Sequence, residues 1–177
     1  AFLSNLCGNV DVIRPVPSSR WNERIYHRAG DRQAYRTYAR RGGFVLDFEA
    51  DWRRYRVPPK LVERNDPLQF MLLEAALDAL EDAGIDIDTI DRTRVATLVG
   101  SVFGSDYALQ LSLAIRVREL AEDVMACGGA DAGVDFERVL AALRAKLPNI
   151  NEDSSGSFSS STLASRTAKT LDFMGPA

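Results

Sequence analysis

The feature of this chain that most constrains its fold is a long apolar stretch, residues 66–84, with helix signals at both ends. Asp66 is a typical N-cap residue, Pro67 suits the first helical position, and Gln69 stands where a capping box places its second member. Gly84 supplies a left-handed stop. The apolar positions recur at helical spacing and predict a largely buried helix: Leu68, Leu72, Leu73, Ala75, Ala76, Leu77, Ala79, Leu80 and Ala83.

A short β-branched segment follows this helix. Residues 95–99 are apolar and are followed by Gly100, which predicts a buried strand of the kind that parallel sheets contain. A glycine-spaced turn at residues 100–104 then leads into a helix expected over residues 106–126. Helix, strand, glycine turn and helix in this order are typical of layered α/β folds, and a chain of 177 residues is expected to form one domain.

Shorter patterns predict the remaining segments. Phe136, Val139, Leu140 and Leu143 share one face of a helix expected over residues 135–147, and a proline follows it. Similar signals predict the end of a helix at residues 1–13 closed by Gly8, a turn at 16–21, a flexible connection at 128–133, a serine-rich loop and helix cap at 154–161, and a last helix at 162–171.

Charge is distributed unevenly along the chain. Residues 1–65 carry 13 Lys and Arg against 7 Asp and Glu, whereas residues 66–177 carry 9 against 18. Seven arginines with interleaved tyrosines fall within residues 20–41, a composition that nucleic-acid-binding segments share. Because no nucleic-acid-binding motif accompanies them, we interpret the segment as a solvated arginine-rich surface. Docking of an acidic protein is a further alternative.

Several classes of protein lack their usual signatures here. No apolar run approaches the roughly 18 residues that span a bilayer, and the first residues lack the basic flank of a signal peptide. Cys7, Cys127 and the lone His27 give neither zinc-ligand spacing nor a disulfide framework. We therefore expect a cytoplasmic protein with no metal, no membrane segment and no nucleic-acid partner.

Motifs that could carry catalysis lack their necessary companions. The glycines of the turn at residues 100–104 are not followed by the Lys-Ser/Thr of a phosphate loop, nor do they form a dinucleotide fingerprint. The serines at 154–157 lack the nucleophile-elbow pattern, and His27 falls in the arginine-rich segment, where a surface position is expected. Paired carboxylates such as Glu81 and Asp82 have polar neighbours and are expected to be solvated. The residues alone give no catalytic set.

Taken in order, the segments resemble a known family. Residues 66–85 are similar to the ketosynthase helix DPQQRLLLE…ALEDAGI, residues 16–21 to its VPxxRW turn, and residues 42–44 to its GGF. Residues 99–108 resemble its VG…DYA strand and turn, and residues 161–177 resemble the helix and Gly-Pro that precede the active-site motif DTACSS. Five motifs in the same order make the chain similar to β-ketoacyl synthase domains of polyketide and polyunsaturated-fatty-acid synthases.

The resemblance implies a thiolase-like layered α/β fold, of which residues 1–177 would be an incomplete N-terminal half. The first strand and everything from the catalytic cysteine onward would lie outside it. The implied activity is an acyltransferase reaction, decarboxylative Claisen condensation, which uses that cysteine and two histidines. No residue here matches them, so we expect no catalytic residue in this chain and no activity from it alone. A catalytically silent, chain-length-factor-like parent domain is the alternative.

The resemblance also implies a substrate site and partners. The glycine turn aligns with a loop that lines the acyl pocket in related condensing enzymes, which places Phe103 at a gate position among Gly100, Ser101, Val102 and Gly104. A plain core position for Phe103 is the alternative. The implied partners are an acyl carrier protein, which itself carries the phosphopantetheine, and a second ketosynthase-like subunit in a homodimer or heterodimer. No cofactor of its own is expected.

Overall fold

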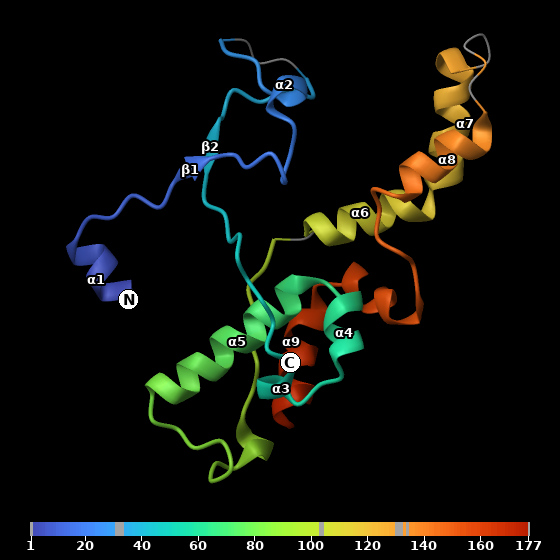
Figure 1. The fold of residues 1–177 in the computed structure, drawn as a ribbon. Helices are drawn as coiled ribbons and strands as arrows, with labels where there is room; N and C mark the ends of the chain where they lie inside the picture. Colours follow the sequence, from blue (N-terminus) through green and yellow to red (C-terminus); the bar gives the residue numbers. More distant parts are fainter. Residues whose placement is uncertain (1, 31–33, 103–104, 130–132, 134, 177) are drawn as a thin grey trace. The chain divides into compact units, whose positions relative to one another are not determined.

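A computed structural model of the chain describes residues 2–30, 34–102, 105–129, 133 and 135–176. Two compact units make up the chain, Ala1–Phe48 and Glu49–Ala177. Helices dominate the second unit, as the ribbon in Figure 1 shows. No helix in these ranges combines the length and the apolar character needed to cross a lipid bilayer.

The first unit is built from short elements: α1 Phe2–Cys7, β1 Arg14–Pro15, α2 Glu23–Tyr26 and β2 Arg41–Gly42. The two strands pair antiparallel, with Arg14 opposite Gly42. The predicted helix near the start of the chain is confirmed, although its left-handed residue is Asn9, with a φ of 49°, and not Gly8. The predicted turn is also confirmed, because the Arg20 N–H donates to the Pro17 carbonyl at 2.9 Å.

The second unit contains α3 Trp52–Tyr55, α4 Pro59–Arg64, α5 Pro67–Asp82, η1 Arg92–Arg94, α6 Asp106–Ile115, α7 Val117–Val124, η2 Met125–Gly129, α8 Phe136–Arg144, η3 Glu152–Phe158 and α9 Ser161–Leu171. The signals at both ends of α5 act as predicted. Asp66 Oδ1 accepts the Leu68 N–H at 2.9 Å, and Gly84 has a φ of 65°. Gln69 is the exception: its amide bonds to the C-terminal part of the chain and completes no capping box.

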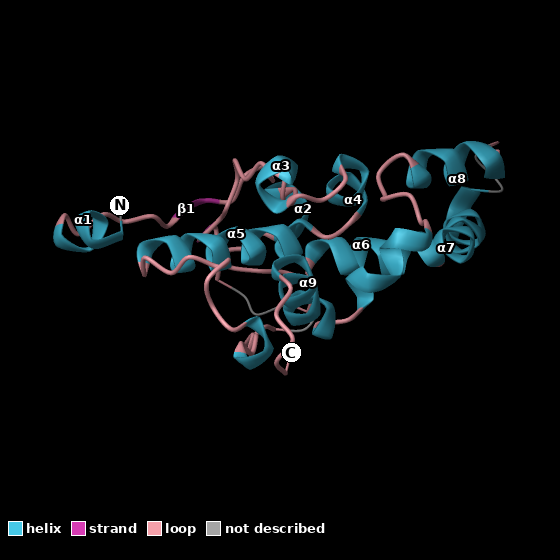
Figure 2. Ribbon diagram, turned by 90° about the horizontal axis from the view of Figure 1, so that it is seen from below, coloured by secondary structure: helices cyan, strands magenta, loops and turns pink. Residues whose placement is uncertain are grey.

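The buried face of α5 is narrower than its apolar pattern predicts. Helix α9 packs against α5 (Figures 1 and 2), and Gln69, Phe70 and Leu73 are almost fully buried. Several of the residues expected in the core are exposed: Leu68, Ala75, Ala79 and Ala83. Within the described part of the chain, no element covers that side of the helix.

The helix predicted over residues 106–126 is interrupted. Helices α6 and α7 meet at Arg116, whose φ of −99° and ψ of 15° depart from helical values. β-Branched Ile115 and Val117 flank the break, and such residues fit a helix less well than unbranched ones. The Arg116 Nε donates to Glu119 Oε2 at 2.7 Å across the first turn of α7. A π-helical turn, η2, continues α7, and Gly128 within it has a φ of 156°.

Helices α7 and α8 pack together around an apolar cluster. Val117, Ala121 and Leu140 are its buried members. The cluster also includes four partly buried residues: Phe136, Val139, Leu143 and Leu147. The face predicted for the helix near residues 135–147 is therefore confirmed, as is the last helix, which is α9.

The strand predicted at residues 95–99 does not form. The segment has no strand pairing, and Leu98 is 87% exposed. Its backbone instead bonds to the C-terminal segment: the Gly175 N–H donates to the Val95 carbonyl at 3.0 Å and the Thr97 N–H to the Pro176 carbonyl at 2.9 Å. A strand needs a neighbouring ladder for its backbone groups. The described part of the chain is thus mainly helical, and it does not show the layered α/β arrangement expected from the sequence.

Candidate functional site

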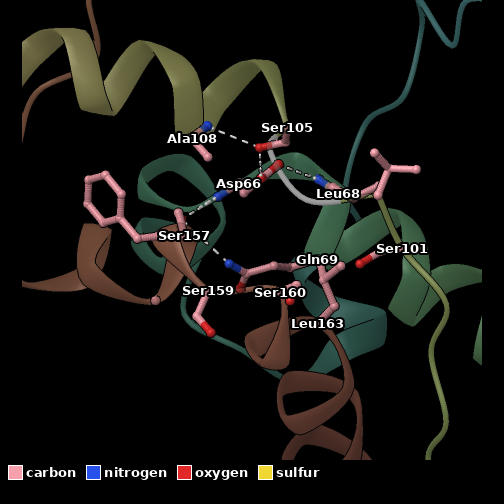
Figure 3. Close-up of a pocket in the computed structure, with 13 residues that line it drawn as sticks. Asp66, Leu68, Gln69, Ser101, Ser105, Ala108, Ser157, Ser159, Ser160 and Leu163 are labelled. Carbon is pink, nitrogen blue, oxygen red and sulfur yellow. Dashed lines mark hydrogen bonds between the residues drawn. The ribbon is translucent and has the colours of Figure 1, made fainter.

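A small polar hollow lies in the second unit where the first turns of α5, α6 and α9 come together (Figure 3). Its volume is about 30 Å³, above the roughly 10–15 Å³ that a cavity needs to hold one water molecule. Serine hydroxyls, one carboxylate and one amide make up most of its polar lining: Ser101, Ser105, Ser157, Ser159, Ser160, Asp66 and Gln69. In this form the hollow is too small to hold an acyl chain.

Asp66 is the centre of the hydrogen bonds in this hollow. Its side chain caps α5 through Leu68, and its Oδ2 accepts a hydrogen bond from Ser105 Oγ. Its backbone N–H donates to Ser157 Oγ at 3.2 Å. Asp66 is only 6% exposed, and a buried carboxylate requires such partners because desolvation disfavours its charge. One residue therefore joins three segments that are distant in the sequence.

Ser105 acts as donor and acceptor at the same time. It is the N-cap of α6, where its Oγ accepts the Ala108 N–H at 3.0 Å while donating to Asp66. In the first turn of α6, the Tyr107 hydroxyl donates to the Arg64 carbonyl at 2.9 Å. Burial raises the pKa of Tyr107, and the Asp66 carboxylate raises it further. The start of α6 is thus attached to the segment that precedes α5.

Arg166 on α9 makes a second link to the same region. Its Nε donates to Gln69 Oε1 at 2.8 Å, and one terminal nitrogen donates to Asn65 Oδ1 at 3.3 Å. Both acceptors are almost fully buried, at 1% and 2% exposure. Burial lowers the pKa of Arg166, and the charge of Asp153 opposes that effect. The residues that flank the start of α5 are therefore held by α9 as well as by α6.

This arrangement can position segments of the chain, and its described lining residues include no histidine. The one described serine that donates to a carboxylate is Ser105, whose oxygen also accepts the Ala108 N–H as the N-cap of α6. Ser157 Oγ accepts from the Asp66 N–H and lies 3.5 Å from Gln69 Nε2. Neither neighbour can take a proton from a serine hydroxyl. The one carboxylate of the hollow is already occupied by its cap and by Ser105.

The structure brings part of the predicted substrate turn to this hollow. Ser101 and Val102 line it, whereas Gly100 does not. Phe103 and Gly104 lie outside the described residues. The sequence did not indicate that the rest of the lining belongs to one site. The sequence pattern at Asp66 and Gln69 predicted only helix capping, and the serines at 154–161 predicted only a loop and a helix cap. No pattern indicated that Ser105 or Arg166 belongs to a site.

The other residues weighed as catalytic or metal-binding lie elsewhere. Cys7 and Cys127 are exposed free thiols, and His27 forms an isolated bridge with Thr37 in the first unit. Glu81 and Asp82 are exposed, as predicted. Within the described ranges, no group of three or more His, Cys, Asp or Glu is placed to hold a metal ion.

A second polar cluster joins α3 to α5. The Arg54 guanidinium pairs with Glu74, with Asp78 at 2.7 Å and with Glu81 at 3.1 Å. Beside it, Tyr55 stacks on Phe70 with ring centroids 6.1 Å apart. The buried Tyr55 Oη and Glu74 Oε2 have no hydrogen-bond partner in the described structure. Burial raises the pKa of Tyr55, and the neighbouring Glu74 carboxylate adds to the increase.

Comparison with known proteins defines the class to which this chain belongs. It is a member of the β-ketoacyl synthase family, because it matches the description "Beta-ketoacyl synthase, N-terminal domain" over residues 1–177. The ketosynthase resemblance seen in the sequence is thereby confirmed.

Individual relatives are polyketide synthases. The chain is 31% identical over 161 residues, 89% of its length, to a phenolphthiocerol/phthiocerol polyketide synthase polypeptide of Mycobacterium tuberculosis. It is 33% identical over 110 residues, 62% of its length, to polyketide synthase ThaG of Burkholderia thailandensis. It is 33% identical over 115 residues, 63% of its length, to another polypeptide of the mycobacterial phenolphthiocerol/phthiocerol synthase. The chain spans 7%, 2% and 7% of the length of these three relatives.

Proposed function

We propose that residues 1–177 form the N-terminal part of a ketosynthase domain that extends an acyl thioester by decarboxylative Claisen condensation in polyketide or fatty-acid biosynthesis. The observation that carries this proposal is the family match along the whole chain. The names of the three relatives, all polyketide synthases, support the same class of reaction.

The proposed reaction has two stages. A cysteine thiolate attacks the carbonyl of an acyl thioester, and the carrier leaves as its thiolate, which takes a proton from water. A malonyl group on the carrier then loses CO₂, and the resulting enolate attacks the cysteine-bound acyl carbon. A carbon–carbon bond forms, the cysteine thiolate leaves, and a 3-oxoacyl group remains on the carrier. No external oxidant or reductant is required.

We assign this chain a positioning role in that reaction. Cys7 and Cys127 are exposed, and the one described serine of the polar hollow that donates to a carboxylate, Ser105, also serves as the N-cap of α6. We propose that the nucleophilic cysteine and two histidines come from another part of the same protein. Ser101 and Val102 would belong to the acyl pocket, which must open further than the present hollow to admit a chain.

The proposed partners are an acyl carrier protein and a second ketosynthase-like subunit. Exposed arginines of the first unit, Arg24 and Arg28 among them, offer positive charge to an acidic carrier. If the carrier docks there, its association rate should fall as salt is raised from roughly 50 to 500 mM, because screening shortens the range of such steering.

The test uses the full-length parent polypeptide with a hexanoyl carrier and a malonyl carrier. We expect CO₂ release, a transient acyl adduct on the protein and a 3-oxoacyl carrier, all detectable by mass spectrometry. A variant with both Cys7→Ala and Cys127→Ala is the matched control, and it should keep full activity. A parent that forms no adduct and releases no CO₂ would refute condensation and favour the catalytically silent, chain-length-factor-like partner.

A further inference from the structure

Helix capping alone does not explain the hydrogen bond between Asp66 and Ser105. Capping of α5 requires only that Asp66 accept the Leu68 N–H, and capping of α6 requires only that Ser105 accept the Ala108 N–H. In addition, the Ser105 hydroxyl donates to the second carboxylate oxygen of Asp66, across 39 positions of sequence. Hydrogen bonds to an ionised acceptor are roughly twice as strong as neutral ones.

The bond is next to the segment that the proposed function assigns to the acyl pocket. Ser105 is close to Ser101 and Val102 in sequence, and all three line the same hollow as Asp66 (Figure 3). Val102 is 93% exposed, so its own side-chain packing does not hold this segment in place. The Asp66–Ser105 bond fixes a neighbouring point in the lining of the same hollow.

We infer that Asp66, acting through Ser105, is a positioning residue that determines which acyl chain lengths the synthase extends. This inference rests on the proposed function and adds the pair of residues that fixes one wall of the acyl site. Asp66 itself bonds to Ser105, Leu68 and Ser157. It acts by holding the start of α6, and with it the segment at Ser101 and Val102, against the start of α5.

Selectivity tests this role better than total activity does. The ratio of kcat/KM for a hexanoyl carrier to that for a lauroyl carrier does not depend on the fraction of protein that is folded. We expect Ser105→Gly in the full-length parent to change this ratio at least about fivefold, since one methylene in an apolar pocket can be discriminated by roughly 10–200-fold. Glycine is an adequate N-cap, so the substitution removes the hydroxyl while leaving α6 nearly as stable.

Three further variants complete the design. Ser105→Thr keeps the hydroxyl and should keep the kcat/KM ratio within about twofold of the parent, a smaller change than the one expected for Ser105→Gly. Asn22→Gly is the matched control: Asn22 caps α2 by accepting the Arg24 N–H at 3.0 Å, the same distance as the cap at Ser105, in the other unit of the chain. Asp66→Asn should shift the ratio in the same direction as Ser105→Gly.

Each result decides the question. An unchanged ratio in Ser105→Gly, or an equal shift in Asn22→Gly, overturns the positioning role and leaves the proposed condensation intact. Loss of condensation with both acyl chains in Ser105→Gly also overturns it, because a positioning role predicts altered selectivity and not inactivation. Absence of condensation by the unmodified parent overturns the proposed function, and this inference with it.

Discussion

Replacing Gly175 with alanine should destabilise the second unit more than the same substitution at two other glycines. A Cβ at this position would lie 2.3 Å from the Val95 carbonyl oxygen, a separation that real Cβ atoms do not show. The obstacle is backbone, so no side chain can rotate away, and the C-terminal segment must move from residues 95–97. That movement breaks the Gly175–Val95 and Thr97–Pro176 hydrogen bonds.

The expected loss follows from these contacts. Two hydrogen bonds contribute about 1 kcal/mol each, and residual crowding adds about 1 kcal/mol. Alanine restricts the unfolded chain, which returns roughly 0.5–1 kcal/mol. The free energy of unfolding should therefore fall by about 2 kcal/mol for Gly175→Ala, the sum of these effects.

Two glycines provide matched controls. Gly84 has open space around a Cβ but a φ of 65°, so Gly84→Ala should cost about 1 kcal/mol through backbone strain alone. Gly100 has open space and no positive φ, so Gly100→Ala should be neutral or stabilise by about 0.5 kcal/mol. Urea unfolding followed by circular dichroism in the far ultraviolet measures all three. A loss for Gly175→Ala no larger than that for Gly84→Ala would show that the close approach to Val95 is not a constraint.

Three further substitutions test the packing and charges of the second unit. Leu140→Ala, in the cluster between α7 and α8, should lower the free energy of unfolding by about 2–5 kcal/mol. Leu113 is 48% exposed, so Leu113→Ala should lower it by less than about 1 kcal/mol. Equal losses for the two variants in urea unfolding would contradict the described core. Tyr55→Phe removes a buried hydroxyl without a partner and should leave stability at about pH 8 unchanged or raise it by up to about 1 kcal/mol. The pKa of Tyr55 is raised in the folded protein, so above about pH 10 the tyrosine ionises first in the unfolded chain and the free energy of unfolding should fall. This fall should be smaller in Tyr55→Phe. An equal fall in both proteins at about pH 10.5 would contradict the raised pKa. Arg54→Met should cost about 1 kcal/mol in low salt and less in about 1 M NaCl, and a loss independent of salt would mean that packing, not charge, is responsible.

Local chemistry explains which elements could be predicted from the sequence. The limits of α5 follow from Asp66, Pro67 and Gly84, whose effects act within one turn of the helix. The strand at residues 95–99 depends on a neighbouring strand, and the described chain provides only the short contact with Gly175 and Pro176. The break at Arg116 was missed because apolar spacing continues through it while the backbone does not.

The candidate site was predictable only in part for a related reason. The resemblance to ketosynthases assigned Ser101 and Val102 to an acyl pocket, which stays a prediction, and in the structure both residues line the polar hollow. The capping pattern indicated Asp66, but capping is a local signal. The bond to Ser105 and the contact between Gln69 and Arg166 join residues 39 and 97 positions apart, and no local pattern contains that information.

These long sequence separations determine when the start of α5 can be completed during synthesis. Asp66 and Asn65 obtain their last partners from Ser157 and Arg166, 91 and 101 residues later. At ribosomal rates of about 5–20 residues per second, that delay is roughly 5–20 s. Until then the polar groups around the first turn of α5 must remain hydrated. The side chains of Phe70 and Leu73 therefore cannot reach the full burial that they have in the folded chain. A ribosome that pauses before Ser157 therefore prolongs the exposure of an apolar helix, and this is the interval in which a chaperone would be most needed.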